Sequence, residues 1–273
     1  MLDDYTYDSR EVIKQNIKSL FFKNSTVIEF RGGFKDFKEV MNISSGYDYE
    51  CIFEKSAKAA ISVRDGLAKY ERDSCLFYDN FKMFELLYAI ESTINQEGSA
   101  NILDFGGGLG SMYFQHRDLL DKNRVKWTIK EQDKFVSFGK EHLSDDLLSF
   151  VSDVDLKKGY NLLILGSSLQ YIEDSKDILK NLLDIQPYMI FIDRTPMCRG
   201  GNRELVYGVF QEIVHQPIYD AEYPMYVFNK DVFDEIITDR GYCKRAEWNP
   251  ATGGSFRYKN KRIVFESSMW SLK

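Results

Sequence analysis

The sequence predicts an α/β fold: a mostly parallel, seven-stranded sheet with helices on both faces and a C-terminal antiparallel hairpin. Three observations lead to it. Short apolar runs alternate with helical periodicities after Gly98, as expected when crossovers join parallel strands. A glycine-rich segment joins the first of these runs to a helix. The last two runs are joined by residues 249–260, which leave no room for a crossover helix, so these two strands should pair antiparallel.

Two parts are expected along the chain. Residues 1–98 indicate an N-terminal, mainly helical extension or lid, and residues 99–273 indicate the domain that contains the sheet. The 273 residues are 44% hydrophobic and 29% charged, values typical of a globular protein with a core. This length fits one large domain, or one domain with an appendage.

The net charge of −6 disfavours nucleic acid as a partner, because phosphate contacts need a basic face. A small-molecule partner is expected instead. No apolar run is long enough to span a membrane, and the first ten residues are too polar for a signal peptide. The four cysteines show no zinc-ligand spacing, which predicts no metal site and fits a reducing, cytoplasmic location. The oligomeric state is left open.

Periodicity places the individual elements. The predicted strands are 101–105, 125–130, 147–151, 160–165, 188–192, 242–248 and 262–266. The predicted helices are 12–20, 81–94, 111–120, 134–143, 175–185 and one that follows residue 229. For that last helix we expect Asn229 as the N-cap, Phe228 and Phe233 as a hydrophobic staple, and Gly241 at the end. No element is predicted for residues 193–227.

The segment from Asp104 to Gly110 joins the first strand to the next helix with the pattern D-x-G-x-G-x-G. Gly106, Gly108 and Gly110 permit a tight turn and the close approach of a ligand, because they carry no Cβ. Gly107 belongs to the same bend. The following helix begins with unpaired N–H groups and a partial positive charge. This combination suits the polar middle and carboxylate of a nucleoside ligand.

Two details favour S-adenosylmethionine (SAM) over a dinucleotide at this turn. A carboxylate at Asp104 can receive the methionine amine, directly or through water, whereas dinucleotide fingerprints hold an apolar residue at that position. The third glycine of those fingerprints falls where this chain has Ser111. A glycine-rich turn without any ligand is the alternative.

The ends of the next strands supply further candidates for the cofactor site. Glu131 ends the second strand, where an acid can accept hydrogen bonds from both ribose hydroxyls, and Gln132 faces the same crevice. Asp153, after the third strand, is a candidate for the adenine amino group, with a plain loop acid as the alternative.

The fourth strand ends in Ser167, Ser168 and Gln170, at the carboxyl edge where open parallel sheets bind their ligands. These side chains are candidates for the wall near the reacting sulfonium.

At these residues the chain resembles the class I SAM-dependent methyltransferases encoded in bacterial surface-polysaccharide gene clusters. The matching segments are YERDS (70–74), LDFG (103–106), YFQ (113–115), Trp127 with EQ (131–132), SSLQY (167–171), IDRTP (192–196), IY (218–219) and YP (223–224). The resemblance implies a Rossmann-like class I methyltransferase fold, SAM as cofactor with S-adenosylhomocysteine as product, and a sugar or glycan-precursor acceptor. It also implies that residues 70–73 form a lid. The chain departs from the family at His116 and near His215, which weakens either histidine as a shared catalytic group.

The acceptor groups are expected after the fourth and fifth strands and before the first. Asp193 is a candidate base and Arg194 a candidate holder of an anionic group, with an ion pair that buttresses the loop as the alternative. His215 is a second candidate base, although a lone histidine is often structural. Tyr223 can stack on a sugar ring, with core packing as the alternative.

The leading hypothesis is therefore a SAM-dependent methyltransferase that O-methylates a sugar or surface-glycan precursor. One alternative is a catalytically inactive SAM-fold subunit that supports a partner enzyme. The other is an NAD(P)-dependent oxidoreductase, which Asp104, Ser111 and the terminal hairpin disfavour.

Overall fold

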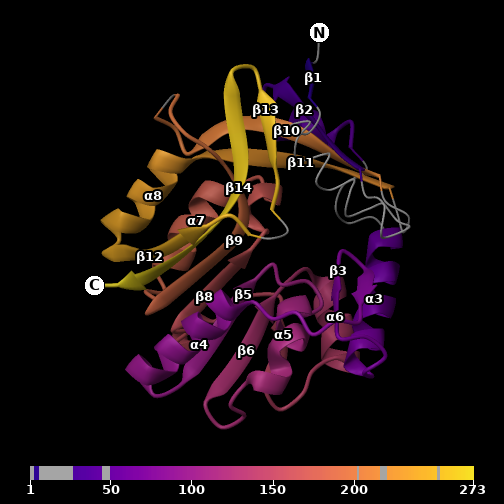
Figure 1. Cartoon of the computed structure of the whole chain (residues 1–273), viewed down its shortest axis with the longest axis vertical. Coiled ribbons are helices and arrows are strands. Elements are labelled where there is room, and N and C mark those ends of the chain that lie inside the picture. The colour runs from indigo at the N-terminus through magenta and orange to yellow at the C-terminus, as the bar shows by residue number, and fades with distance from the viewer. Residues whose placement is uncertain (1–2, 6–26, 45–49, 202, 216–219, 251–252) are drawn as a thin grey trace.

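The computed structural model describes residues 3–5, 27–44, 50–201, 203–215, 220–250 and 253–273. Within them, the parallel strands are β5 (Ala100–Phe105), β6 (Val125–Lys130), β7 (Leu148–Val151), β8 (Leu162–Gly166) and β9 (Met189–Cys198). They lie side by side in the order β7-β6-β5-β8-β9 (Figure 1). β14 (Lys261–Leu272) runs antiparallel beside β9, and β12 (Tyr242–Trp248) antiparallel beside β14. The predicted fold class is confirmed in its central part, a mostly parallel α/β sheet with antiparallel C-terminal strands.

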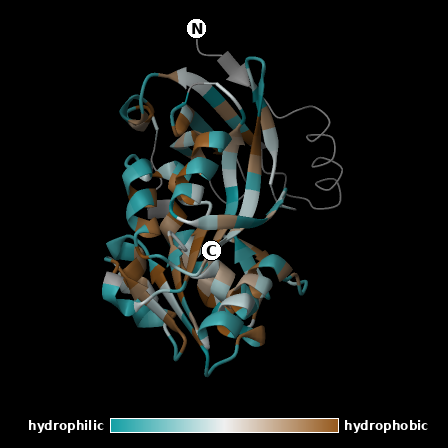
Figure 2. Ribbon diagram, turned by 90° about the vertical axis from the view of Figure 1, so that its left-hand side faces the viewer, coloured by the Kyte–Doolittle hydropathy of each residue, from teal (hydrophilic) through white to brown (hydrophobic). Residues whose placement is uncertain are grey.

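Side chains of the parallel strands alternate between two cores, as the period of two in a β-strand requires. Ile102 and Ile164 pack on one face, and their neighbours Leu103 and Leu165 on the other. The first face is covered by α4 (Phe84–Glu97), α5 (Ser111–His116) and α6 (Asp133–His142), and the second by α7 (Ser175–Leu183) and α8 (Lys230–Asp239). Figure 2 shows hydrophobic residues concentrated along the central strands, with hydrophilic residues on the outer helix turns. No helix of the described residues is long and apolar enough to cross a membrane.

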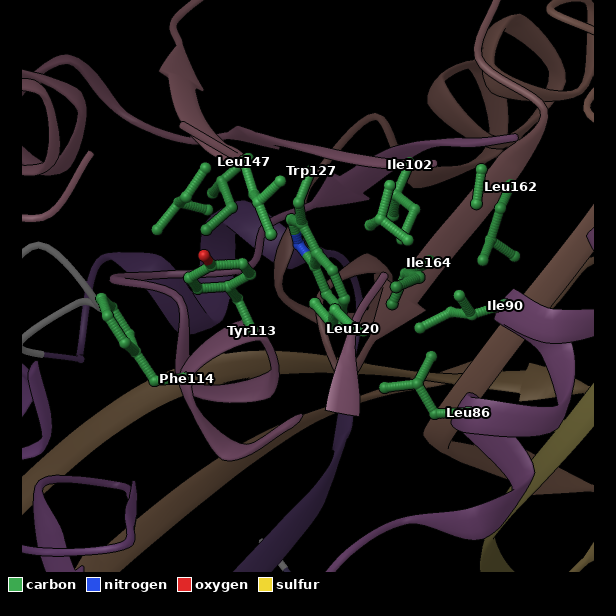
Figure 3. Close-up of a cluster of buried hydrophobic side chains, with 14 of the residues drawn as sticks. Leu86, Ile90, Ile102, Tyr113, Phe114, Leu120, Trp127, Leu147, Leu162 and Ile164 are labelled. Carbon is green, nitrogen blue, oxygen red and sulfur yellow. The ribbon is translucent and has the colours of Figure 1, made fainter. Parts of the chain in front are cut away.

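Trp127 lies at the centre of the first core, between Tyr113 on one side and Ile102 and Ile164 on the other (Figure 3). Its indole Nε1 donates a hydrogen bond of 3.1 Å to the Asp104 carboxylate. The ring of Tyr113 meets it edge to face, with 5.8 Å between the ring centroids. Through the Trp127 indole, this core therefore fixes the position of the Asp104 carboxylate near the end of β5.

The C-terminal helix begins as the sequence predicts. The Asn229 side chain accepts hydrogen bonds from the N–H groups of Asp231 and Val232, at 3.1 and 3.4 Å. The rings of Phe228 and Phe233 lie 5.5 Å apart, which confirms the hydrophobic staple. Gly241 follows the helix with a φ of +90°, a conformation that glycine adopts without strain.

Residues 193–227, for which the sequence predicts no element, contain strands. β9 continues to Cys198, and the chain then forms the antiparallel pair β10 (Val206–His215) and β11 (Asp220–Asn229). The prediction that the fifth strand ends at residue 192 was wrong. Pro224 lies inside β11, which is tolerated because, among the described strands, β9 pairs with β11 only at Phe228 and Asn229.

The N-terminal part, which the sequence predicts to be mainly helical, also contains strands. It contributes α2 (Phe37–Met41), α3 (Glu50–Arg64) and α4, together with β1 (Asp3–Tyr5), β2 (Val27–Phe34) and the hairpin of β3 (Tyr70–Arg72) and β4 (Cys75–Phe77). Two glycines make β2 resemble a loop in sequence. At Gly32 a Cβ would lie 2.6 Å from the rings of Phe210 and Tyr258, so glycine admits this close packing. The helix predicted at 12–20 lies outside the described residues.

The extra strands enlarge the predicted seven-stranded sheet to twelve strands among the described residues. β2, β10 and β11 form a curved layer beyond the carboxyl end of β9, joined by β13 (Ser255–Tyr258) and the first half of β14 (Figure 1). The layer has its own aromatic core, in which Phe30 stacks on Phe256 with 4.0 Å between ring centroids. The layer reaches the edge of the parallel sheet where a ligand is expected, because the hydroxyl of Tyr171, which follows β8, donates a hydrogen bond to Glu212 of β10.

Gly139 tests the packing of α6 on the sheet, because a Cβ there would lie 2.6 Å from the ring of Phe150. Alanine improves helix propensity by about 1 kcal/mol, but overpacking costs about 1–3 kcal/mol. Gly139→Ala is therefore expected to destabilise the fold by about 1 kcal/mol, measured by urea unfolding. A stabilised variant would contradict this packing.

Candidate functional site

A cavity of about 530 Å³ opens at the carboxyl ends of β5, β6 and β8, where α2, α3 and the β3–β4 hairpin contribute to its walls. Figure 1 shows α3 and β3 beside α5 and α6, at this edge of the sheet. The structure brings together five of the predicted cofactor residues in the cavity lining: Gly106, Gly108, Glu131, Gln132 and Ser167. Strand ends far apart in sequence thus meet in one wall.

The glycine turn presents bare backbone to this cavity. Gly106, Gly108 and Gly110 have φ values of +72°, +57° and +90°, all in the left-handed region that favours glycine. A Cβ on Gly106 would lie 2.5 Å from the Cβ of Ser168, whereas one on Gly108 would meet nothing within 4 Å. The turn is therefore closely packed behind Gly106 and open at Gly108.

Asp104 lies beneath this turn and not in the cavity lining. Its carboxylate is 1% exposed, and a Cβ on Gly107 would lie 2.6 Å from it. Burial raises the pKa of Asp104 to about 7, although the Trp127 hydrogen bond lowers it and nearby Glu131 adds to the rise. The carboxylate supports the turn from below, while Gly107 and Gly110 lie outside the cavity lining.

Glu131 follows β6 and lies half-buried on the cavity wall. Its carboxylate accepts a hydrogen bond of 3.2 Å from the N–H of Gln132. Burial raises the pKa of Glu131, and this effect exceeds the lowering by that N–H and by Lys130. Gln132 is exposed and is the N-cap residue of α6.

The end of β8 forms the opposite part of the wall. Ser167 lines the cavity with a φ of +62°, and the amide of Gln170 donates a hydrogen bond of 2.7 Å to its Oγ. Gln170 is fully buried, so it supports Ser167 and does not reach the cavity. Ser168 lines the cavity, and its buried Oγ has no hydrogen-bond partner among the described residues.

The remaining predicted residues whose side chains the structure describes lie outside the cavity lining. Asp153 is exposed and absent from its lining. Asp193 is 2% exposed, accepts a hydrogen bond of 2.7 Å from Ser267 Oγ and pairs with Arg194 Nε at 2.9 Å. This geometry matches the buttressing ion pair that the sequence left open. Burial lowers the pKa of Arg194, but Asp193 and Asp73 together raise this pKa by more than burial lowers it. The guanidinium therefore stays charged.

His215 and Tyr223 lie on the pair β10–β11. His215 ends β10, in register with Val27 and Asp220, and its side chain lies outside the part of the chain that the structure describes. Tyr223 is buried, and its ring meets that of Tyr171 edge to face at 5.1 Å. Tyr171, and not Tyr223, lines the cavity.

The β3–β4 hairpin, whose residues 70–73 the family resemblance implied as a lid, carries cavity residues to which the sequence assigned no chemical role. Asp73 and Ser74, with φ values of +49° and +65°, form its two-residue turn, a geometry that matches the twist of the paired strands. Glu71, Asp73 and Ser74 line the cavity, and Ser74 Oγ lies 3.1 Å from Ser56 Oγ of α3. The YERDS motif was the sequence signal for this segment.

Carboxylates dominate the charge of the lining. The described lining residues include Glu71, Asp73, Glu131 and Glu173, against Lys130 as the single cation. A cation entering this cavity gains favourable Coulomb energy, and an anion meets repulsion. The wall therefore favours a positively charged or neutral ligand.

No protein-family model matches the chain, and no curated protein matches it. Solved structures match at low identity. An S-adenosylmethionine-dependent methyltransferase from Clostridium acetobutylicum is 10% identical, with a TM-score of 0.43, over 68% of this chain and 89% of that one. SAM-bound CalS10, an amino pentose methyltransferase from Micromonospora echinaspora, is 9% identical, with a TM-score of 0.46, over 70% and 91%. The N-terminal domain of EvdMO1, in the presence of S-adenosylhomocysteine and D-fucose, is 10% identical, with a TM-score of 0.43, over 80% and 95%.

Proposed function

We propose that this protein is a SAM-dependent methyltransferase that methylates a hydroxyl group of a sugar or glycan precursor. The observation that carries the proposal is the shared wall of one cavity. Its glycine turn, open at Gly108, and the strand-end acid Glu131 line the same space. A nucleoside with a polar tail needs both features at once.

The residues present fit SAM. Backbone at Gly106 and Gly108 can approach its methionine part, and Glu131 can accept hydrogen bonds from the ribose hydroxyls. Leu109 and Phe135 add an apolar wall against which a purine can pack. The acidic lining suits the positive sulfonium.

The protein's part in such a reaction is mainly positioning. When bound, SAM would supply an activated methyl group for transfer to the acceptor oxygen, with the electron pair of the broken C–S bond left on sulfur. The surrounding walls align the acceptor and exclude water, since the donor is already activated. Tyr171, Ile172 and Ile178 line the cavity and can contact a sugar ring.

The direct test is release of S-adenosylhomocysteine from SAM in the presence of pooled methyl pyranosides and nucleotide sugars. Acceptor-dependent release is the expected result. Binding of S-adenosylhomocysteine without release from any pool would instead favour the non-catalytic subunit. Binding of NADH without binding of S-adenosylhomocysteine would instead favour the NAD(P)-dependent oxidoreductase.

Glu131→Ala is expected to weaken binding of S-adenosylhomocysteine by about 1–3 kcal/mol, roughly 5- to 150-fold, because the ribose loses its acceptor. Isothermal titration calorimetry measures this loss. Asp153→Ala is the matched control, since that acid is exposed and outside the cavity lining, and its affinity should equal that of the wild type. If the wild type, Glu131→Ala and Asp153→Ala bind S-adenosylhomocysteine with equal affinity, Glu131 does not contact the cofactor.

A further inference from the structure

Glu71 is a buried carboxylate on the cavity wall with little hydrogen bonding. Its side chain lines the cavity although the residue is only 8% exposed. In the described part of the chain, its Oε2 accepts one hydrogen bond, from the N–H of Ser74 at 3.1 Å. The hairpin turn therefore holds the carboxylate and leaves it capacity to accept a further hydrogen bond from a ligand.

Charged groups of both signs lie around Glu71. Arg72 and Asp73 lie beside it on the hairpin, and Arg194 acts on it from β9. The lining residues of α3 and α5, Ile52, Ser56 and Ser111, are uncharged. Burial raises the pKa of Glu71 to about 7 and Asp73 adds to this rise, although the Ser74 N–H and the two arginines lower it. A carboxylate in this range exchanges its proton near neutral pH.

Glu212 provides an internal comparison. It is buried as well, and its pKa is also raised to about 7, by burial first, against the Tyr171 hydrogen bond, with Asp73 adding to the rise. Its Oε2, however, accepts the hydroxyl of Tyr171 at 2.9 Å, and Glu212 does not line the cavity. The two glutamates therefore share burial and acidity but differ in access to a ligand.

We propose that Glu71 is the proton acceptor for the methylated group, and that this group is a neutral hydroxyl. The inference rests on the proposed function. As the acceptor oxygen forms its bond to the methyl carbon, the O–H bond breaks and its proton passes to a Glu71 oxygen. The carboxylate becomes a carboxylic acid, which later releases the proton to solvent.

The charge of the cavity supports the second half of this proposal. An acceptor with a carboxylate or phosphate at the reacting end would face Glu71, Asp73 and Glu173. Among the described residues Lys130 is the single cation in the lining, and Arg72 and Arg194 lie outside the lining. A hydroxyl brings no charge of its own and needs a base to release its proton. Hydroxylated acceptors should therefore be methylated in preference to carboxylates.

The experiment compares the wild type, Glu71→Gln and Glu212→Gln, using the methyl pyranoside or nucleotide sugar that gives the fastest release. Glu71→Gln should lower kcat by roughly 100-fold or more, while the affinity for S-adenosylhomocysteine stays unchanged. The wild-type rate should rise with pH through about pH 7, as the base ionises, and this limb should vanish in Glu71→Gln alone. Both variants should fold, because glutamine removes a buried charge from each site.

Infrared difference spectra supply a readout without turnover. With S-adenosylhomocysteine bound, the carboxylic acid bands that titrate near pH 7 should include one from Glu71 beside those of Asp104 and Glu212, and Glu71→Gln should lose this band while Glu212→Gln keeps it. Carboxylic acid bands in Glu71→Gln equal to those of the wild type, or kcat and a pH profile equal to those of the wild type, would overturn the role of Glu71. Failure of the wild type to bind S-adenosylhomocysteine would instead overturn the proposed function.

Discussion

Gly106→Ala is expected to lower the free energy of unfolding by about 3 kcal/mol. Two effects add at this residue. Alanine at a φ of +72° is strained by about 1–2 kcal/mol, and a Cβ that lies 2.5 Å from the Cβ of Ser168 overpacks the turn by about 1–3 kcal/mol. Ser168 Cβ is fixed to the backbone, so the turn itself must shift. Binding of S-adenosylhomocysteine should weaken by at least about tenfold, since 1.4 kcal/mol suffices for that loss.

Gly108→Ala separates strain from overpacking. Its φ of +57° is equally unfavourable to alanine, but a Cβ there meets nothing within 4 Å. Its unfolding free energy should therefore fall by only about 1–2 kcal/mol. Urea unfolding of both variants measures the difference, and an equal loss in the two would contradict the close contact with Ser168.

Stability is expected to fall by several kcal/mol between pH 5 and pH 8. Burial is the main cause that raises the pKa of Asp104, Glu71 and Glu212 to about 7, from ordinary values of 3.8 for aspartate and 4.5 for glutamate. The folded protein keeps these protons where the unfolded chain releases them. The stabilising contribution is thus complete below about pH 4 and is lost as the pH rises through 7.

The size of this effect follows from the shifts. Each pKa unit corresponds to about 1.4 kcal/mol, so each carboxyl contributes about 3–4 kcal/mol at most. Thermal unfolding across pH 5–8 measures the slope. Glu212→Gln should reduce the slope of stability against pH by the contribution of one carboxyl group, because glutamine has no proton to lose. A stability that rises over this range would contradict the burial of these groups.

Local pattern predicted much of the fold and of the cofactor wall. Short apolar runs located the central strands, because strands that are buried on both faces of a parallel sheet are apolar at nearly every position. The glycine turn and Glu131 were predicted because strand ends of a parallel sheet meet at one edge. Five of the predicted cofactor residues do line one cavity.

Long-range packing explains what the sequence left out. Gly32 and Pro224 weaken the strand signal of β2 and β11, although aromatic rings and an unpaired edge accommodate them. The position of Asp104 below the turn depends on the Trp127 indole, a contact that the sequence pattern does not encode. Glu71 reaches the cavity only because a hairpin folds over the sheet edge.

A crystal structure with S-adenosylhomocysteine tests the central claim most directly. We predict density for the nucleoside in the cavity, with its ribose hydroxyls within hydrogen-bond distance of the Glu131 carboxylate and its amino-acid part against the backbone of Gly106 and Gly108. Density at another place, or an empty cavity at saturating ligand, would contradict the proposed cofactor site.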